Sequence, residues 1–281
     1  MSIKDSRGFW NLVKLLEASA EPNIAKMLEP FSTSIIDLYE CGVEVCTLIQ
    51  TSHAHHKYLG VVGLFLKRLL NDIRSVWILL TLGYTSEAGA IAAASFENAL
   101  IIICITEEEN RAKRLLEYGG SPWSIAELCK MYARQWGKSD KKEQGENDID
   151  NDIDYETVWR GNYAIYQWLC KLKHPHMASV LHDAYSVSIE GRYGIMAAPD
   201  DRIEDLPNKA GVLSAIILYT HTAIKNLAKA GALDYKDEKG QFWQKRFDSI
   251  VPNYARAMEP IRKNTELPFD YMGRMKRKDK K

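Results

Sequence analysis

One glutamate, Glu97, stands in the most hydrophobic stretch of the chain and is the first candidate for chemistry. On a helix its neighbours at three, four and seven residues are Ala90, Ala93, Ala94, Ile101 and Cys104. An unpartnered buried carboxylate costs several kcal/mol, so Glu97 needs a partner, a proton or a cavity. Asn98 adjoins it, and Arg74 lies at a similar height if the two segments form a hairpin about residues 83–86. We therefore expect either an Arg74–Glu97 ion pair that fixes helix register or a polar site in a helical cleft.

A second group of reactive side chains ends at His174. The residues that share this helical stripe are Trp159, Tyr163, Tyr166, Cys170 and His174. Pro175 forces the backbone out of the helix directly after His174, and a histidine at a helix C-terminus is favoured as a cation. This histidine is either a general acid or base, or a cap for the last carbonyl groups of the helix. The candidate binding residues around the two groups are Arg74, Asn98, Tyr166, Lys173 and His176.

Histidines and cysteines do not form a recognisable metal motif. Residues 53–56 contain three histidines, but no Asp, Glu or Cys stands beside them to complete a ligand shell. Cys170 and His174 are four residues apart, and no second pair stands at ligand spacing. Partial matches to calcium-binding and phosphate-binding loops lack their required glycines. We therefore assign no metal, leave the cofactor unknown and find no complete catalytic motif.

The elements that must position these residues are helical. Apolar residues recur at three- and four-residue spacing over 9–16, 25–49, 53–82, 86–105, 107–118, 122–136, 155–173, 207–231 and 241–263. Pro22 is expected to end the first helix, and Ser86 to cap the fourth. No stretch alternates with a period of two residues long enough for a sheet. The sequence predicts one all-α domain over 1–281, an irregular multi-helix bundle of about eight to ten helices with an acidic mobile loop at 137–154 and a basic C-terminal tail at 274–281.

Composition excludes several classes of protein. The 281 residues contain 37 basic and 37 acidic side chains, and this neutral balance argues against a dedicated nucleic-acid coat. Five cysteines without a CxxC pair indicate reduced thiols. The longest apolar stretch, 91–105, is interrupted by Glu97 and Asn98 and is too short for a membrane span. We expect a cytoplasmic protein that does not enter a membrane, and leave open a homodimer and a nucleic-acid contact of the basic tail.

The runs Arg74–Tyr84, Glu87-Ala88, Ser95–Leu100 and Leu169–Pro175 resemble a bacterial and archaeal family of helical proteins of unknown function. That family is loosely similar to HEPN-like and abortive-infection proteins, and the resemblance covers about residues 60 to 180. It implies an all-α fold and a stress or phage-defence context. The family has an arginine four residues before the glutamate, where this chain has Ala93, and the arginine-x4–6-histidine motif of helical ribonucleases is absent. The resemblance therefore supports the fold more than a function.

These observations favour a non-enzymatic helical protein. We expect it to bind a partner or small ligand in a bundle cleft lined by Arg74, Glu97, Tyr166 and His174. The alternative is a hydrolase or nuclease in which Glu97 orients His174, and Arg74 or Lys173 stabilises phosphate charge.

Overall fold

The computed structural model describes residues 8–49, 56–143, 155–173, 188–189, 192–193 and 198–264. In these ranges the chain forms eight α-helices, which confirms the all-α multi-helix bundle. Their bounds are α1 (Gly8–Leu48), α2 (His56–Thr81), α3 (Thr85–Glu107), α4 (Glu109–Tyr118), α5 (Ile125–Glu143), α6 (Tyr155–Lys173), α8 (Leu206–Ala230) and α9 (Glu238–Asn264). The short elements are the 3-10 turn η1 (Ile203–Asp205) and the antiparallel pair β1 (Ser188–Ile189) and β2 (Arg192–Tyr193).

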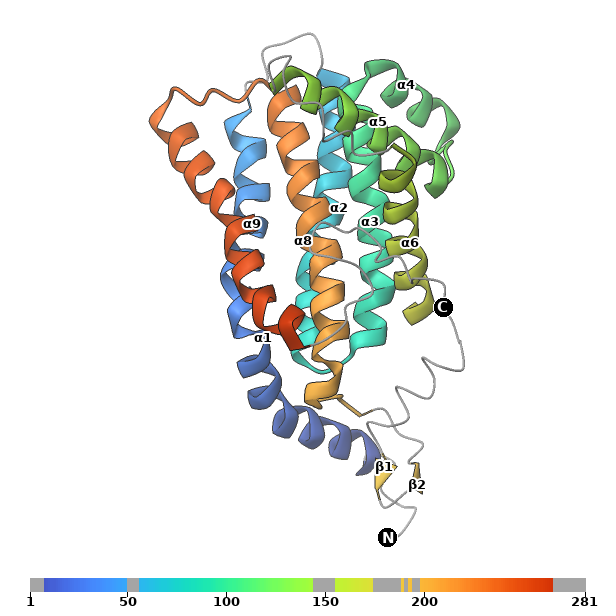
Figure 1. Ribbon diagram of the computed structural model, residues 1–281, viewed down its shortest axis with the longest axis vertical. Helices are drawn as coiled ribbons and strands as arrows, with labels where there is room; N and C mark the ends of the chain where they lie inside the picture. Colours follow the sequence, from blue (N-terminus) through green and yellow to red (C-terminus); the bar gives the residue numbers. More distant parts are fainter. Residues whose placement is uncertain are drawn as a thin grey trace.

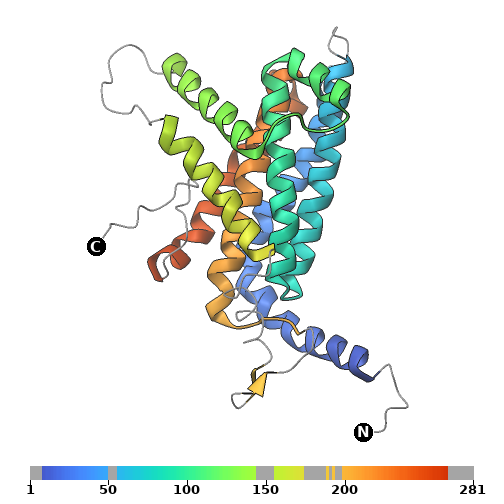
Figure 2. The same ribbon diagram turned by 90° about the vertical axis from the view of Figure 1, so that its right-hand side faces the viewer.

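The two central helices are α3 and α8, which pack against each other. α2 lies against α3, and α1 and α9 pack together beside α8 (Figures 1 and 2). By length and composition α3 alone among the described helices is able to cross a membrane, but 78% of its most apolar window is buried inside the bundle. This burial identifies α3 as a core helix. Most of α8 is buried as well, so it does not offer the dimer face that an exposed half of this helix would imply.

The first helix is longer than the sequence predicts. α1 runs from Gly8 to Leu48 and contains Pro22 and Pro30, so the expectation that Pro22 ends a first helix is wrong. A proline inside a helix removes a backbone hydrogen bond and bends the helix, at a cost of about 3 kcal/mol. Ile24 and Leu28 are fully buried on the next turns, and burial of two such side chains contributes about 3–6 kcal/mol. The first turns of α1 lean away from the bundle (Figures 1 and 2).

Two further boundaries differ from those expected. α5 extends to Glu143, so residues 137–143 are helical and do not belong to the mobile loop predicted over 137–154. The lysines of this part have good helix propensity, and no proline interrupts it. Residues 144–154 and the predicted tail at 274–281 lie outside the described residues. α3 begins at Thr85, so Ser86 lies inside the helix and is not its cap.

Close contact with α3 holds the C-terminal half of α6. A Cβ atom at Gly89 of α3 would lie 2.8 Å from Cδ1 and 2.9 Å from Cβ of Leu172. Ile165 and Leu169 of α6 are fully buried in the same interface. In contrast, α5 leans away from the bundle (Figure 2). The glycine therefore lets α6 approach α3 at this end, while the other end of α6 pairs with α5.

Replacing Gly89 with alanine is expected to lower the free energy of unfolding by about 1–3 kcal/mol, because the added methyl group overpacks the α3–α6 contact. The matched control is Gly63→Ala in α2, where a Cβ atom meets nothing within 4 Å. There the better helix propensity of alanine should stabilise the protein by about 0.5–1 kcal/mol. Urea unfolding followed by far-UV circular dichroism measures both variants. Equal effects of the two substitutions would contradict the close approach.

A histidine lies between α8 and α9 without a charge. His221 stacks on Phe247 with ring centroids 4.1 Å apart, and Phe247 stacks in turn on Trp243. Burial lowers the pKa of His221 to about 4, and the charge of Lys225 acts in the same direction. A hydrogen bond with the Phe247 backbone and the charge of Asp248 oppose this shift. The neutral imidazole is therefore part of the packed α8–α9 interface.

Acidification should destabilise the protein through His221. Its pKa is about 4 in the folded chain and about 6.5 in the unfolded chain, so the unfolded chain binds more protons between these values. The stability that His221 contributes is complete above pH of about 6.5 and is lost as the pH falls toward 4, by up to about 3 kcal/mol. The measurement compares unfolding free energies of the wild type and His221→Phe across this window. A difference between them that does not change with pH would contradict the burial of a neutral histidine.

Candidate functional site

A line of polar side chains lies where α6 packs on the bundle. We call it the α6 seam, and it comprises Trp159, Asn162 and Tyr166 of α6, Glu97 of α3 and Tyr219 of α8. The three α6 residues are three and four positions apart, so they follow one another along one side of the helix. Trp159 and Tyr166 are half-buried and pack against the core, and Asn162 is only 6% exposed.

At one end of the α6 seam, Tyr166 is bonded to Glu97. The Tyr166 hydroxyl donates to Oε1 of Glu97 at 2.7 Å, and the Tyr166 ring lies 5.9 Å from the ring of Phe96. Burial raises the pKa of Tyr166, and hydrogen bonds with Glu97 and Cys170 raise it further. Tyr166 therefore stays a neutral phenol, and its hydrogen bond supplies the partner that the Glu97 carboxylate needs.

In the middle of the α6 seam, Asn162 meets Tyr219. The Tyr219 hydroxyl donates to Oδ1 of Asn162. The ring of Tyr219 lies 4.3 Å from that of Phe96 and 5.9 Å from that of Tyr132, and burial raises the pKa of Tyr219. The aromatic rings enclose this hydrogen bond, so the Asn162 amide is fixed with its oxygen toward α8.

Two donors of the α6 seam have no acceptor. Nδ2 of Asn162 and Nε1 of Trp159 are buried, and neither has a hydrogen-bond partner within the described part of the chain. Because more than nine in ten buried polar groups in folded proteins are paired, two such donors one turn apart on the same helix are unusual.

Cations surround the outer end of the α6 seam. Nζ of Lys130, on α5, lies 4.8 Å from the centroid of the Trp159 ring, and the guanidinium of Arg160 lies 5.5 Å from it. Arg160 forms an ion pair with Glu156 at 2.9 Å. Lys130 is half-buried and forms no ion pair with any residue in the described ranges. Of the two cations over the Trp159 ring, Lys130 is thus the one without an ion pair in the described ranges, although its charge acts on the exposed Glu127 of the same helix.

The structure brings together only some of the residues that the sequence assigns to one cleft. Glu97 and Tyr166 do meet, but Arg74 is exposed on α2 and forms no ion pair with Glu97, so that predicted pair is wrong. The side of α2 that faces α3 carries Asp72, and Nδ2 of Asn98 donates to Oδ2 of Asp72 at 3.2 Å. Successive helical residues differ by 100°, so Asn98 faces α2 while Glu97 faces α6.

Three other predicted site residues are not placed. Lys173 is the last residue of α6, and its side chain lies outside the described part, as do His174 and His176. The pairing of Glu97 with His174 in a hydrolase or nuclease therefore stays a prediction. Among the described residues, no group of three or more His, Cys, Asp or Glu side chains is arranged to hold a metal ion.

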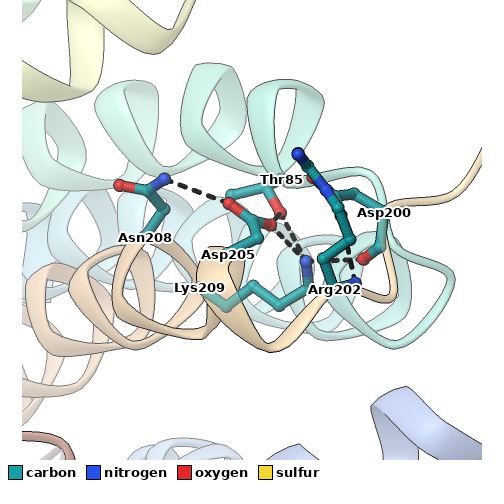
Figure 3. Close-up of polar contacts among 6 residues, drawn as sticks. All are labelled: Thr85, Asp200, Arg202, Asp205, Asn208 and Lys209. Atoms are coloured by element: carbon teal, nitrogen blue, oxygen red, sulfur yellow. Dashed lines mark hydrogen bonds and ion pairs between the residues drawn. The ribbon is translucent and has the colours of Figure 1, made fainter. Parts of the chain in front are cut away.

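A second polar group, which the sequence analysis does not identify, lies at the start of α8. We call it the α8 cluster, and it comprises Thr85, Asp200, Arg202, Asp205, Asn208 and Lys209 (Figure 3). Lys209 and Asp205 form an ion pair and are both 0% exposed. Nζ of Lys209 also donates to Oγ1 of Thr85 at 3.0 Å and to the backbone oxygen of Asp200 at 2.8 Å. These three acceptors use all three hydrogens of the ammonium group.

The α8 cluster joins the α2–α3 turn to the segment before α8. The backbone N–H of Asp200 donates to the Gly83 oxygen at 3.0 Å. Gly83 has φ of 87°, and a Cβ atom there would lie 2.7 Å from Cβ of Pro199. A side chain at position 83 is thus excluded by the backbone conformation and by the close contact. The α8 cluster is a buried structural connection whose central cation is fully paired.

The sequence does carry a signal for the α8 cluster. Asp205 and Lys209 are four residues apart, and Lys209 is followed by apolar residues at helical spacing, as Glu97 is. A buried lysine needs a partner as much as a buried glutamate does, so Lys209 also indicates a paired polar group.

Comparison with known proteins does not identify a relative. No family model, no curated protein and no solved structure matches the chain. The function is therefore argued from the α6 seam and the α8 cluster.

Lys209→Met should destabilise the protein by about 3–5 kcal/mol, because it leaves the Asp205 carboxylate buried without its cation. The double variant Lys209→Met/Asp205→Leu should recover most of that loss. The control is Lys263→Met, which breaks an exposed pair with Glu259 at 2.7 Å and should leave stability almost unchanged. Urea unfolding of the three variants gives the comparison. A single variant as stable as the wild type would contradict the burial of the pair.

Proposed function

We propose that this chain is a helical binding protein whose α6 seam takes a small ligand that accepts hydrogen bonds. The observation that carries this proposal is the pair of buried donors, Nε1 of Trp159 and Nδ2 of Asn162, without acceptors in the described structure. Each unpaired buried donor costs about 1–3 kcal/mol. A ligand with acceptor atoms at both positions would remove this cost, so the folded protein favours its binding.

The α8 cluster and the α6 seam differ in whether their buried donors have hydrogen-bond acceptors. In the α8 cluster, Lys209 has an acceptor for each of its hydrogens, and Asp205 also accepts from Thr85 at 2.5 Å. The α6 seam has equally buried polar atoms, but two of its donors stay open. The contrast supports a structural role for the α8 cluster and a binding role for the α6 seam.

The protonation states of the α6 seam favour binding over acid–base chemistry. A catalytic acid, base or nucleophile commonly has its pKa shifted toward the working pH. The pKa values of Tyr166 and Tyr219 are raised, which moves them away from neutrality. Burial also raises the pKa of the nearby Cys129 thiol to about 12, which keeps it protonated. These groups act as neutral donors and packing residues.

The biological setting is part of the proposal. The resemblance of the residues around Glu97 and Leu169–Pro175 to HEPN-like and abortive-infection proteins supports a bacterial stress or phage-defence system.

Native and denaturing mass spectra of the purified protein test the proposal. We expect the wild type to retain extra mass under native conditions, and Trp159→Phe to lose it because this variant lacks the indole N–H. The matched control is Trp243→Phe, since Nε1 of Trp243 already donates to the Cys41 oxygen at 3.0 Å. This control should keep the ligand and lose about 1 kcal/mol of stability with its hydrogen bond. A bare wild-type chain, or extra mass that Trp159→Phe retains, would overturn the proposal.

A further inference from the structure

We infer that the group bound at the α6 seam is an anion, a carboxylate or a phosphate, held by the indole N–H of Trp159, the amide N–H of Asn162 and the ammonium group of Lys130. This inference rests on the proposed function and names the class of its ligand. Three observations support it: which atoms are open, where the nearest cation lies, and how the carboxylate of Glu97 is placed.

The buried unpaired atoms of the α6 seam are both donors. Oδ1 of Asn162 already accepts from Tyr219, and Oε1 of Glu97 accepts from Tyr166. Within the α6 seam, the buried atoms without partners in the described structure are Nε1 of Trp159 and Nδ2 of Asn162; the other such atoms, Oγ of Ser95, Oγ1 of Thr220 and Nε2 of His221, belong to residues outside the seam. A ligand that satisfies them must present acceptors, and a carboxylate or phosphate has at least two oxygen atoms for this purpose.

The cation beside these donors is that of Lys130, whose charge also acts on the exposed Glu127 carboxylate of the same helix. Its ammonium group lies 4.8 Å from the centroid of the same indole ring whose N–H is open, and it forms no ion pair in the described ranges. Arg160 also lies on this ring, but Glu156 neutralises it. An anion at the N–H edge of Trp159 would therefore meet a half-buried cation, and hydrogen bonds to charged groups are the stronger ones.

Glu97 does not oppose an anion at this place. Its carboxylate is bonded to Tyr166, which follows Asn162 by four residues, about one helical turn, along α6. Trp159 lies three residues before Asn162, at the opposite end of the α6 seam. The anion thus binds at the Trp159 end, beside Lys130, with Asn162 between it and the carboxylate.

The test follows the indole N–H resonance of Trp159 in a ¹⁵N-labelled sample. The chain has 7 tryptophans, and Trp159→Phe assigns this resonance by its disappearance. The probes are inorganic phosphate, acetate and the uncharged acetamide, each added at constant ionic strength. We expect phosphate or acetate to shift the resonance in a saturable way, with the tighter of the two identifying the acid group, and acetamide to have little effect.

Paired variants of α5 give the control for charge. Lys130→Met should weaken anion binding at least about tenfold, because it removes the cation and keeps the length of the side chain. Arg134→Met removes a cation that lies 6.0 Å from the Tyr155 ring, one turn away on the same helix, and should leave binding unchanged. Equal losses in both variants would indicate general charge attraction and overturn the inference.

The outcomes separate this inference from the proposed function. Retained extra mass that proves to be an uncharged compound, or acetamide binding as tightly as acetate, would leave the binding function standing and refute the anion. A bare chain in the native spectrum together with a Trp159 resonance that no probe shifts would refute both.

Discussion

The burial of α3 on almost every side is the constraint on which the arrangement of the other helices depends. A helix that is apolar all round can pack in several rotations about its axis, so apolar packing alone does not select one. Three polar side chains fix the rotation of α3 about its axis. Thr85 is hydrogen-bonded to the start of α8, Glu97 to α6 and Asn98 to α2. Each is buried or half-buried and needs its partner. A slip of one residue would turn α3 by about 100° and remove all three hydrogen bonds together.

Buried polar groups need hydrogen-bond partners, and the α8 cluster and the α6 seam differ in whether the chain supplies them. In the α8 cluster the chain supplies these partners, because the side chains of Lys209, Asp205 and Thr85 are hydrogen-bonded to one another. This connection also holds the α2–α3 turn at Gly83. At the α6 seam this need is not met, because Nε1 of Trp159 and Nδ2 of Asn162 have no acceptor in the described structure. The α8 cluster is therefore complete within the chain, and the α6 seam is not.

Helical periodicity predicts most of the fold, because the spacing of apolar residues is a local property of the chain. The all-α class, the buried α3 and the inward position of Tyr166 follow from it. The continuation of α1 through Pro22 does not, since it depends on core residues contributed by other helices. The partner of Glu97 does not follow either: Arg74 and Tyr166 both fit the sequence, and only the rotation of α3 decides between them. Which side chain pairs with Glu97 therefore depends on how the helices pack, and local sequence does not determine it.

An unpaired donor in a folded interior is also a source of selectivity. Two of them cost about 2–6 kcal/mol, which is a large fraction of the 5–15 kcal/mol that stabilises a typical domain. A ligand that supplies both acceptors recovers this free energy as affinity, by a factor of roughly 30 to 10⁴ in the dissociation constant. A ligand that supplies one acceptor recovers only about half of this free energy, because the other donor stays buried and unpaired.

The position of these donors along α6 decides which helices a ligand of the proposed kind would contact. Leu172 fixes the C-terminal half of α6 against Gly89, and this half stays with the core. Trp159 and Asn162 lie in the N-terminal half, where Lys130 of α5 lies over the Trp159 ring and Tyr219 of α8 donates to Asn162. Under the proposed function, a ligand at these donors would therefore contact α5 and α6 together and tie both helices to α8.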